Sequence, residues 1–205
     1  DSIAKIWNQD RRESFADRME QSYWMSENES KNQPYNLRDN SYWREPIEMA
    51  NKREVERITL LKSTQVGGTV TSYGILIAAA LIDPAPSMIV FPTEPEAKLQ
   101  RDRISENMLA SAPALRHLVP PRHSWNMTAI DMQTQLVYIA YSKGKQTMRG
   151  KPCRRVLMTE TDVYGDDDAY GTPEDRTKRF PDKLILEEST PKGNQSYIFK
   201  QFEKS

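Results

Sequence analysis

The segment that most constrains this chain is a turn of small residues between a strand pattern and a helix pattern. A strand-forming run at 58–61 leads into the turn, and the stretch 70–82, with an apolar block at 75–82, follows it. The turn consists of Lys62, Ser63, Thr64, Gln65, Val66, Gly67, Gly68 and Thr69. Backbone N–H groups in such a turn, together with the N-terminus of the next helix, favour a bound anion. The sequence therefore predicts an α/β domain with a phosphate-binding loop.

This turn departs from the usual phosphate-loop pattern, which is glycine, four residues, then Gly-Lys-Ser/Thr. Gly67 and Thr69 take the places of the second glycine and the magnesium-binding hydroxyl. Gly68 stands where the lysine is expected, and Lys62 stands where the first glycine is expected. The long stem of Lys62 could curl back to a β- or γ-phosphate. The pattern alone leaves open a plain Gly-Gly turn, capped by Thr69, beside an ordinary surface lysine.

Composition excludes several other classes of protein. With 29 basic and 29 acidic residues the formal net charge is zero, so contact with nucleic acid has to come from a local patch. Cys153 is the single cysteine, and with only His117 and His123 beside it neither an internal disulfide nor a zinc site is expected. The longest apolar block, 75–82, is far too short to span a bilayer, no secretory signal is visible, and we expect no membrane association.

A second motif is an apolar strand at 156–158 that runs into carboxylates at Glu160 and Asp162. In P-loop ATPases we expect such a strand beside the loop strand, with one acid holding magnesium through water and another polarising the attacking water. Thr159 stands where the first aspartate usually lies, so either Asp162 or Glu160 itself would have to bind the metal. The alternative is a buried strand whose acids merely face solvent.

A third motif is a further strand pattern at 183–188, which ends in Ser189, Thr190 and Pro191. Hydroxyl groups at the carboxyl end of a strand, next to a nucleotide, can sense the γ-phosphate by hydrogen bonding. Alone this motif is weak, because Ser-Thr-Pro is common where a strand enters a turn.

These motifs, with the text Met148-Arg149-Gly150 before a buried strand, together resemble the large terminase subunit of tailed phages. The similarity is greatest to the lambda-like, GpA-type branch and covers about residues 35–205, which would be the ATPase domain of that protein. Residues 1–34 are then an N-terminal arm or helix, and the family's C-terminal nuclease domain is not in this chain. The resemblance implies an α/β P-loop NTPase of the RecA/helicase-like, ASCE type, with a central, mostly parallel sheet flanked by helices.

The resemblance also implies a function, an ATPase motor that drives double-stranded DNA into a procapsid with ATP and Mg²⁺ as cofactors. Lys62 and Glu160 would be catalytic, and residues 62–69 would bind the phosphates. Tyr42, in the aromatic pair with Trp43, matches the position that packs near the adenine, although a core aromatic is equally expected there. The other implied roles are metal binding by Thr69, Glu160 and Asp162, and coupling by Ser189 and Thr190. The implied partners are the terminase small subunit, the portal protein and further copies in a homo-oligomeric ring, in the host cytoplasm.

The densest basic segment lies at 143–155 and comprises Lys143, Lys145, Arg149, Lys151, Arg154 and Arg155. Lys143, Lys145, Arg149 and Lys151 are the candidate contacts to DNA phosphates, and a solvated loop is the alternative. Thr64 replaces an arginine that some other terminases carry in the loop, so an arginine for the transition state would come from another subunit.

Two alternatives to the packaging motor stay open. A degenerate, non-hydrolysing P-loop scaffold that binds DNA or partner proteins would explain Gly68 and Thr159 directly. A helicase-like translocase outside packaging would share the chemistry, but it would need a second motor domain.

Overall fold

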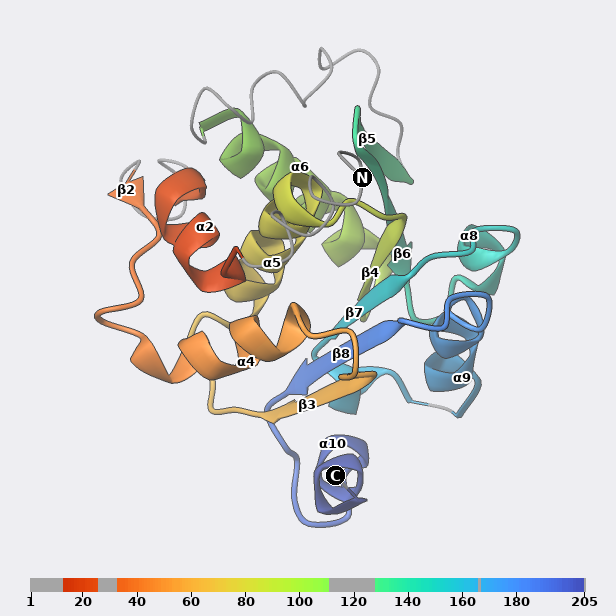
Figure 1. Ribbon diagram of the computed structural model, residues 1–205. Helices are drawn as coiled ribbons and strands as arrows, with labels where there is room; N and C mark the ends of the chain where they lie inside the picture. Colours follow the sequence, from red (N-terminus) through yellow and green to blue (C-terminus); the bar gives the residue numbers. More distant parts are fainter. Residues whose placement is uncertain (1–12, 26–32, 111–127, 166, 205) are drawn as a thin grey trace.

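The computed structural model describes residues 13–25, 33–110, 128–165 and 167–204, and its centre is a six-stranded sheet (Figure 1). The strand order is β3-β8-β7-β4-β6-β5, and all neighbours are parallel except the antiparallel edge pair β5 and β6. The strands are β3 (Arg57–Leu61), β4 (Ser87–Phe91), β5 (Ala129–Met132), β6 (Gln135–Tyr141), β7 (Arg155–Thr159) and β8 (Leu184–Ser189). A separate small sheet pairs β1 (Trp24–Met25) with β2 (Gln33–Pro34). The α/β sheet expected from the sequence is thus confirmed.

Helices cover both faces of the sheet, with α2, α4, α5 and α6 on one side and α8, α9 and α10 on the other (Figure 1). Their bounds are α2 (Phe15–Ser22), α4 (Arg44–Ala50), α5 (Gly68–Ile82), α6 (Glu94–Ala110), α8 (Lys145–Met148), α9 (Asp167–Asp175) and α10 (Tyr197–Lys204). Two short 3-10 turns, η1 (Ser41–Trp43) and η3 (Thr161–Val163), complete the described elements. Within these residues no helix has the length and apolarity that a bilayer crossing requires.

The strands alternate between two hydrophobic cores. Ile89 and Phe91 of β4 belong to the larger core, with α5, whereas Met88 and Val90 belong to a second core, with Tyr164. A parallel sheet that is covered on both faces needs apolar side chains in both directions. This is why its strands appear in the sequence as continuous apolar runs.

The strand order corrects one expectation. The acidic strand β7 does not lie beside the loop strand β3, because β8 is inserted between the two. The three strands are parallel, so their carboxyl ends lie side by side at the same end of the sheet, and all three sequence motifs converge there. The insertion also brings the last residues of β8 to the centre of this edge.

The helix expected near the N-terminus is present as α2 and packs on α5. Phe15 and Met19 of α2, and Tyr23 just after it, are fully buried in the larger core. Ser14 caps the helix, because its hydroxyl accepts a hydrogen bond of 2.9 Å from the N–H of Asp17. Gly74 of α5 permits the close approach, since a methyl group there would overlap Met19. Residues 1–12 and 26–32 of the expected N-terminal arm lie outside the described residues.

Candidate functional site

The loop between β3 and α5 turns through two residues in the left-handed region of backbone space. Gln65 has φ of 58° and Gly67 has φ of 82°. The carbonyl of Gly67 then accepts the N–H of Thr71 at 2.9 Å, which begins the hydrogen bonding of α5. Alternation of right- and left-handed residues turns successive N–H groups toward one side and makes an anion-binding concavity. The loop therefore has the local shape that its sequence predicts.

The stem of Lys62 runs over Gly68, and this explains why the two residues depart from the usual pattern together. A methyl group on Gly68 would lie 2.8 Å from Cε and 2.9 Å from Cδ of Lys62. Contacts under 3.0 Å would force the stem aside. A side chain at 68, the usual lysine included, would therefore compete with Lys62 for the same space.

The ammonium group of Lys62 lies between two carboxylates. Its Nζ is 2.7 Å from Oε1 of Glu160 and 3.0 Å from Oε2 of Glu188. Burial alone would lower the pKa of Lys62, but the charge of Glu188 and the hydrogen bond to Glu160 more than offset this and raise it. The relocated lysine and the surviving acid of the second motif are thus brought together at the mouth of the glycine turn.

Glu188 is the site residue to which the sequence analysis gave no role. Its side chain is fully buried, and the burial raises its pKa to about 7 against the lowering effect of Lys62. Oε1 of Glu188 lies 3.5 Å from Oγ1 of Thr69, a long hydrogen bond. Oε2 makes the ion pair with Lys62 and has no other hydrogen-bond partner within the described residues. Glu188 follows Glu187 near a strand end, and neither residue carries a signal in the sequence that marks it as functional.

Thr159 takes no part in the cluster of Lys62, Glu160 and Glu188. Its hydroxyl donates 3.2 Å to the carbonyl of Val90 on β4, and the residue is 1% exposed. Thr159 and Glu188 are register partners on β7 and β8. The carboxylate that is absent from the end of β7 is therefore present one strand away, at the same level of the sheet.

Glu160 and Asp162 have different binding partners although they are only two residues apart. Glu160 has a left-handed φ of 50°, which turns its side chain to Lys62 at the end of β7. The carboxylate of Asp162 accepts the N–H of Lys192 at 2.9 Å and that of Ile198 at 2.8 Å. Both oxygens of Asp162 therefore hold the start of α10 and the turn before it, whereas the ion pair with Lys62 is made by Glu160.

The Ser-Thr-Pro turn is joined directly to the loop. The N–H of Lys62 donates 3.1 Å to the carbonyl of Ser189, and the hydroxyl of Ser189 accepts 3.2 Å from the N–H of Asp162. The hydroxyl of Thr190 is buried and has no hydrogen-bond partner within the described part of the chain. The structure therefore joins Ser189 to the phosphate loop, and Thr190 follows it with a buried hydroxyl.

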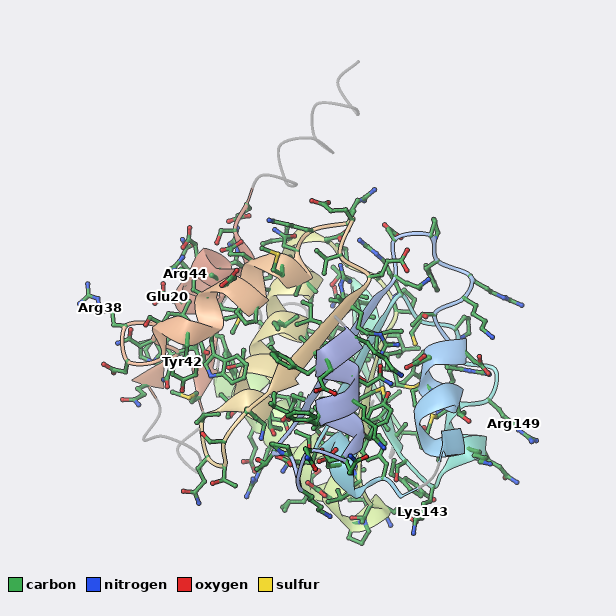
Figure 2. All side chains as sticks on the ribbon, turned by 90° about the horizontal axis from the view of Figure 1, so that it is seen from below. Glu20, Arg38, Tyr42, Arg44, Lys143 and Arg149 are labelled. Atoms are coloured by element: carbon green, nitrogen blue, oxygen red, sulfur yellow. The ribbon has the colours of Figure 1, made fainter. Side chains whose placement is uncertain are left out.

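An apolar hollow of about 440 Å³ opens beside Lys62 and Ser63. Tyr42, Trp43 and Phe202 line it, and Tyr42 is 54% exposed, so it is not a core aromatic. Trp43 Nε1 and the hydroxyl of Tyr42 both donate to the carbonyl of Val66, at 2.7 and 3.1 Å. These bonds fix the aromatic pair against the phosphate loop, on the α4 side of the molecule, where Figure 2 shows Tyr42.

The basic segment divides into two parts with different roles. Arg154 and Arg155 are buried and pair with Asp83, each at 2.7 Å, so they belong to the interior. Lys143, Lys145 and Arg149 are exposed, and Lys151 lies over the ring of Tyr138 at 5.3 Å. Figure 2 shows Lys143 and Arg149 extending outward near α8, on the side of the molecule opposite Tyr42 and Arg38.

The donor set at the loop suits Mg²⁺ bound together with a nucleotide, although no group of three or more metal-ligating side chains occurs within the described residues. Mg²⁺ in nucleotide sites keeps several waters and takes few protein ligands besides the phosphates. The hydroxyl of Thr69 beside the buried carboxylate of Glu188 is such a set. The residues present therefore fit the ion.

The sheet order, the glycine turn before α5 and the lysine–carboxylate pair define a P-loop NTPase. Residues 30–205 match the family described as phage terminase large subunit gpA, ATPase domain. The chain therefore belongs to this family.

Solved structures agree on the fold. The large terminase ATPase domain of Thermus phage P74-26 superposes with a TM-score of 0.52 at 15% identity, over 79% of this chain and 66% of that one. A point mutant of the same domain gives 0.58 at 15% identity, over 83% of this chain and 70% of that one. Among curated proteins, none is significantly similar in sequence.

Proposed function

We propose that this chain is the ATPase motor domain of a viral packaging terminase and couples ATP hydrolysis to the movement of double-stranded DNA into a procapsid. The observation that supports this most directly is the contact of 2.7 Å between Lys62 Nζ and Glu160 Oε1 at the mouth of the loop. A charge-neutralising cation and a water-activating carboxylate are the two side chains that phosphoryl transfer to water needs most.

Before ATP binds, Lys62 pairs with both Glu160 and Glu188. A triphosphate on the N–H groups of residues 63–69 would attract the ammonium group, whose flexible stem runs over Gly68. The transfer of Lys62 to the phosphates releases Glu160, which then orients and polarises a water molecule for attack in line with the γ-phosphate. Mg²⁺, when bound beside Thr69, supplies charge neutralisation on the phosphates. The hollow lined by Tyr42 and Phe202 would take the adenine.

Hydrolysis is coupled to movement through the Ser-Thr-Pro turn. Ser189 contacts the loop through Lys62 and contacts the acidic turn through Asp162. Asp162 in turn holds the first N–H groups of α10. A change in the γ-phosphate that Thr190 or Ser189 senses would therefore pass to α10. We assign Asp162 to this tether, because both of its carboxylate oxygens are already bound to backbone N–H groups.

The proposed contacts to DNA phosphates lie in and around α8, and they are the exposed Lys143, Lys145 and Arg149 and the half-buried Lys151. The remaining partners of the proposed motor are the terminase small subunit, the portal protein and further copies of the chain in a ring, in the host cytoplasm. Because Thr64 occupies the place of a loop arginine, the arginine for the transition state would come from the neighbouring copy. The isolated domain should then hydrolyse ATP slowly.

Replacement of the proposed water-activating acid tests the assignment. Glu160→Gln should lower ATP turnover at least about 100-fold, because an amide cannot polarise water as a carboxylate does, and should leave nucleotide affinity within about threefold. Phosphate release with DNA present measures the first quantity, and calorimetric titration with ADP measures the second. The exposed Glu54→Gln is the matched control. Turnover by Glu160→Gln at the control's rate would refute the proposed role.

The non-hydrolysing scaffold remains a second candidate because of Thr159, whose hydroxyl is bound to Val90 and brings no charge to the site. The same assay separates the two. A scaffold would be stabilised by ATP against heat but would release no phosphate, whether or not DNA and the other terminase components are present.

A further inference from the structure

We propose that Glu188, on the strand between the loop strand and the acidic strand, supplies the magnesium carboxylate that Thr159 lacks. The inference rests on the proposed ATPase function, and it assigns a residue outside the motifs that usually carry this task.

Glu188 is placed in the sheet where it can stand in for the missing aspartate. Glu188 and Thr159 are direct register partners on the parallel strands β8 and β7. Neighbouring strands lie about 4.8 Å apart, so the end of a glutamate side chain on β8 can reach the space beside a missing aspartate on β7. The extra methylene of glutamate, compared with aspartate, lengthens that reach.

Glu188 also contacts the phosphate loop. Glu188 Oε1 lies 3.5 Å from the hydroxyl of Thr69, the residue at the magnesium-binding position of the loop. A metal ion that contacts Thr69 therefore has a carboxylate beside it. Asp162, the other candidate, is bound by the N–H groups of Lys192 and Ile198 instead.

The charge of Glu188 depends on Lys62 for its compensation. Glu188 and Glu160 share a single cation, Lys62. Glu188 is completely buried, and within the described residues the only partner of its Oε2 is Lys62. A buried carboxylate is stable only if a cation or hydrogen-bond donors compensate it. When the phosphates attract Lys62, a divalent cation is the group that can replace it at Glu188.

Manganese binding tests the inference without reference to turnover. Mn²⁺, which substitutes for Mg²⁺ at oxygen sites, is titrated into the domain with the non-hydrolysable analogue AMP-PNP, and free Mn²⁺ is read from its electron paramagnetic resonance signal. Glu188→Gln should weaken Mn²⁺ affinity at least tenfold, whereas metal-free binding of AMP-PNP should be unchanged or tighter. The matched control is Glu96→Gln, which removes a half-buried carboxylate that feels the charge of Glu160 but forms no ion pair with Lys62.

A double variant keeps the test decisive. Exchange of the register partners, Thr159→Asp with Glu188→Thr, should restore Mn²⁺ affinity to within about threefold of the natural chain. Unchanged Mn²⁺ affinity in Glu188→Gln would overturn the inference, even if turnover fell, because Glu188 would then only position Lys62. Absence of AMP-PNP binding by the natural chain would instead overturn the proposed function, and the inference with it.

Discussion

Glu187 and Glu188 are successive residues of β8, and both side chains are fully buried, but they point to opposite faces of the sheet and differ in how their charges are compensated. On one face, Oε1 of Glu187 accepts hydrogen bonds from Arg57 at 3.0 Å and Thr59 at 2.8 Å, and Oε2 accepts one from Tyr197 at 3.1 Å. On the other face, Glu188 shares Lys62 with Glu160 and keeps one oxygen without a hydrogen bond.

The difference separates a structural charge from a functional one. The buried carboxylate of Glu187, with both oxygens hydrogen-bonded and a cation beside it, holds β3, β8 and α10 together. A buried carboxylate with incomplete compensation costs stability and gains it back when a cation binds. Burial is the same for both residues, so the number of donors around each carboxylate decides its role.

The largest expected effect is on activity, at the Glu188 face. Lys62→Met should lower ATP turnover roughly 1000-fold, since it removes the charge that stabilises the transferring phosphoryl group. The midpoint of thermal unfolding should move by less than about 4 °C, because Glu188 has a raised pKa and can become neutral. Steady-state phosphate release measures turnover, and a thermal melt measures the unfolding midpoint. The control is Lys52→Met, which replaces an exposed lysine. Turnover by Lys62→Met near that of the control would show that the charge on the Glu188 face has no functional role.

The corresponding change on the Glu187 face should act on stability instead. Arg57→Met leaves Glu187 buried without its cation and should destabilise the fold by about 3 kcal/mol. For a chain of this size that corresponds to a fall of roughly 6–12 °C in the unfolding midpoint. Turnover measured at 20 °C, well below that midpoint, should stay within about threefold. A variant that melts normally but turns over slowly would show that this face is functional too.

Gly68→Ala sharpens the comparison by moving Lys62 without removing its charge. The methyl group would lie 2.8 Å from Cε of Lys62, so the ammonium group has to shift away from both carboxylates. We expect turnover to fall about tenfold and stability to change by less than about 1 kcal/mol, because the displaced atoms end a flexible side chain. Gly171→Ala is the control, as a methyl group there has no atom within 4 Å. Equal turnover in the two variants would contradict the proposed path of the stem.

The smallest expected effect is on stability and concerns a third charge cluster, formed by Asp83 with Arg154 and Arg155 at the amino end of β7. Burial would raise the pKa of Asp83, but the hydrogen bond from Arg154 and the charge of Arg155 more than offset this and lower it below the usual 3.8. A lowered pKa stabilises the fold above about pH 3.8, and the stabilisation is lost as pH falls through the value in the folded state. Asp83→Asn should therefore cost about 1–2 kcal/mol at pH 7 and less below pH 3. Urea unfolding across this pH range checks it, and an equal cost at pH 7 and at pH 3 would contradict it.

Local patterns in the sequence were sufficient for the elements that carry the three motifs. The strand patterns predicted β3, β7 and β8, and the glycine turn predicted the start of α5. Each of these depends on neighbours within a few residues. The proximity of Lys62 and Glu160 also followed, since both stand at the carboxyl ends of strands in one parallel sheet.

The tertiary structure alone decided which strand lies beside which. Strand order and register are non-local, so the sequence could not show that β8 separates β3 from β7 or that Thr159 faces Glu188. The division of the basic segment, with Arg154 and Arg155 buried against Asp83 and Lys143 and Arg149 exposed, is non-local for the same reason. The sequence determined which chemical groups are present at the strand ends. The packing of the sheet determined which of them are compensated, because compensation depends on donors that lie far away along the chain.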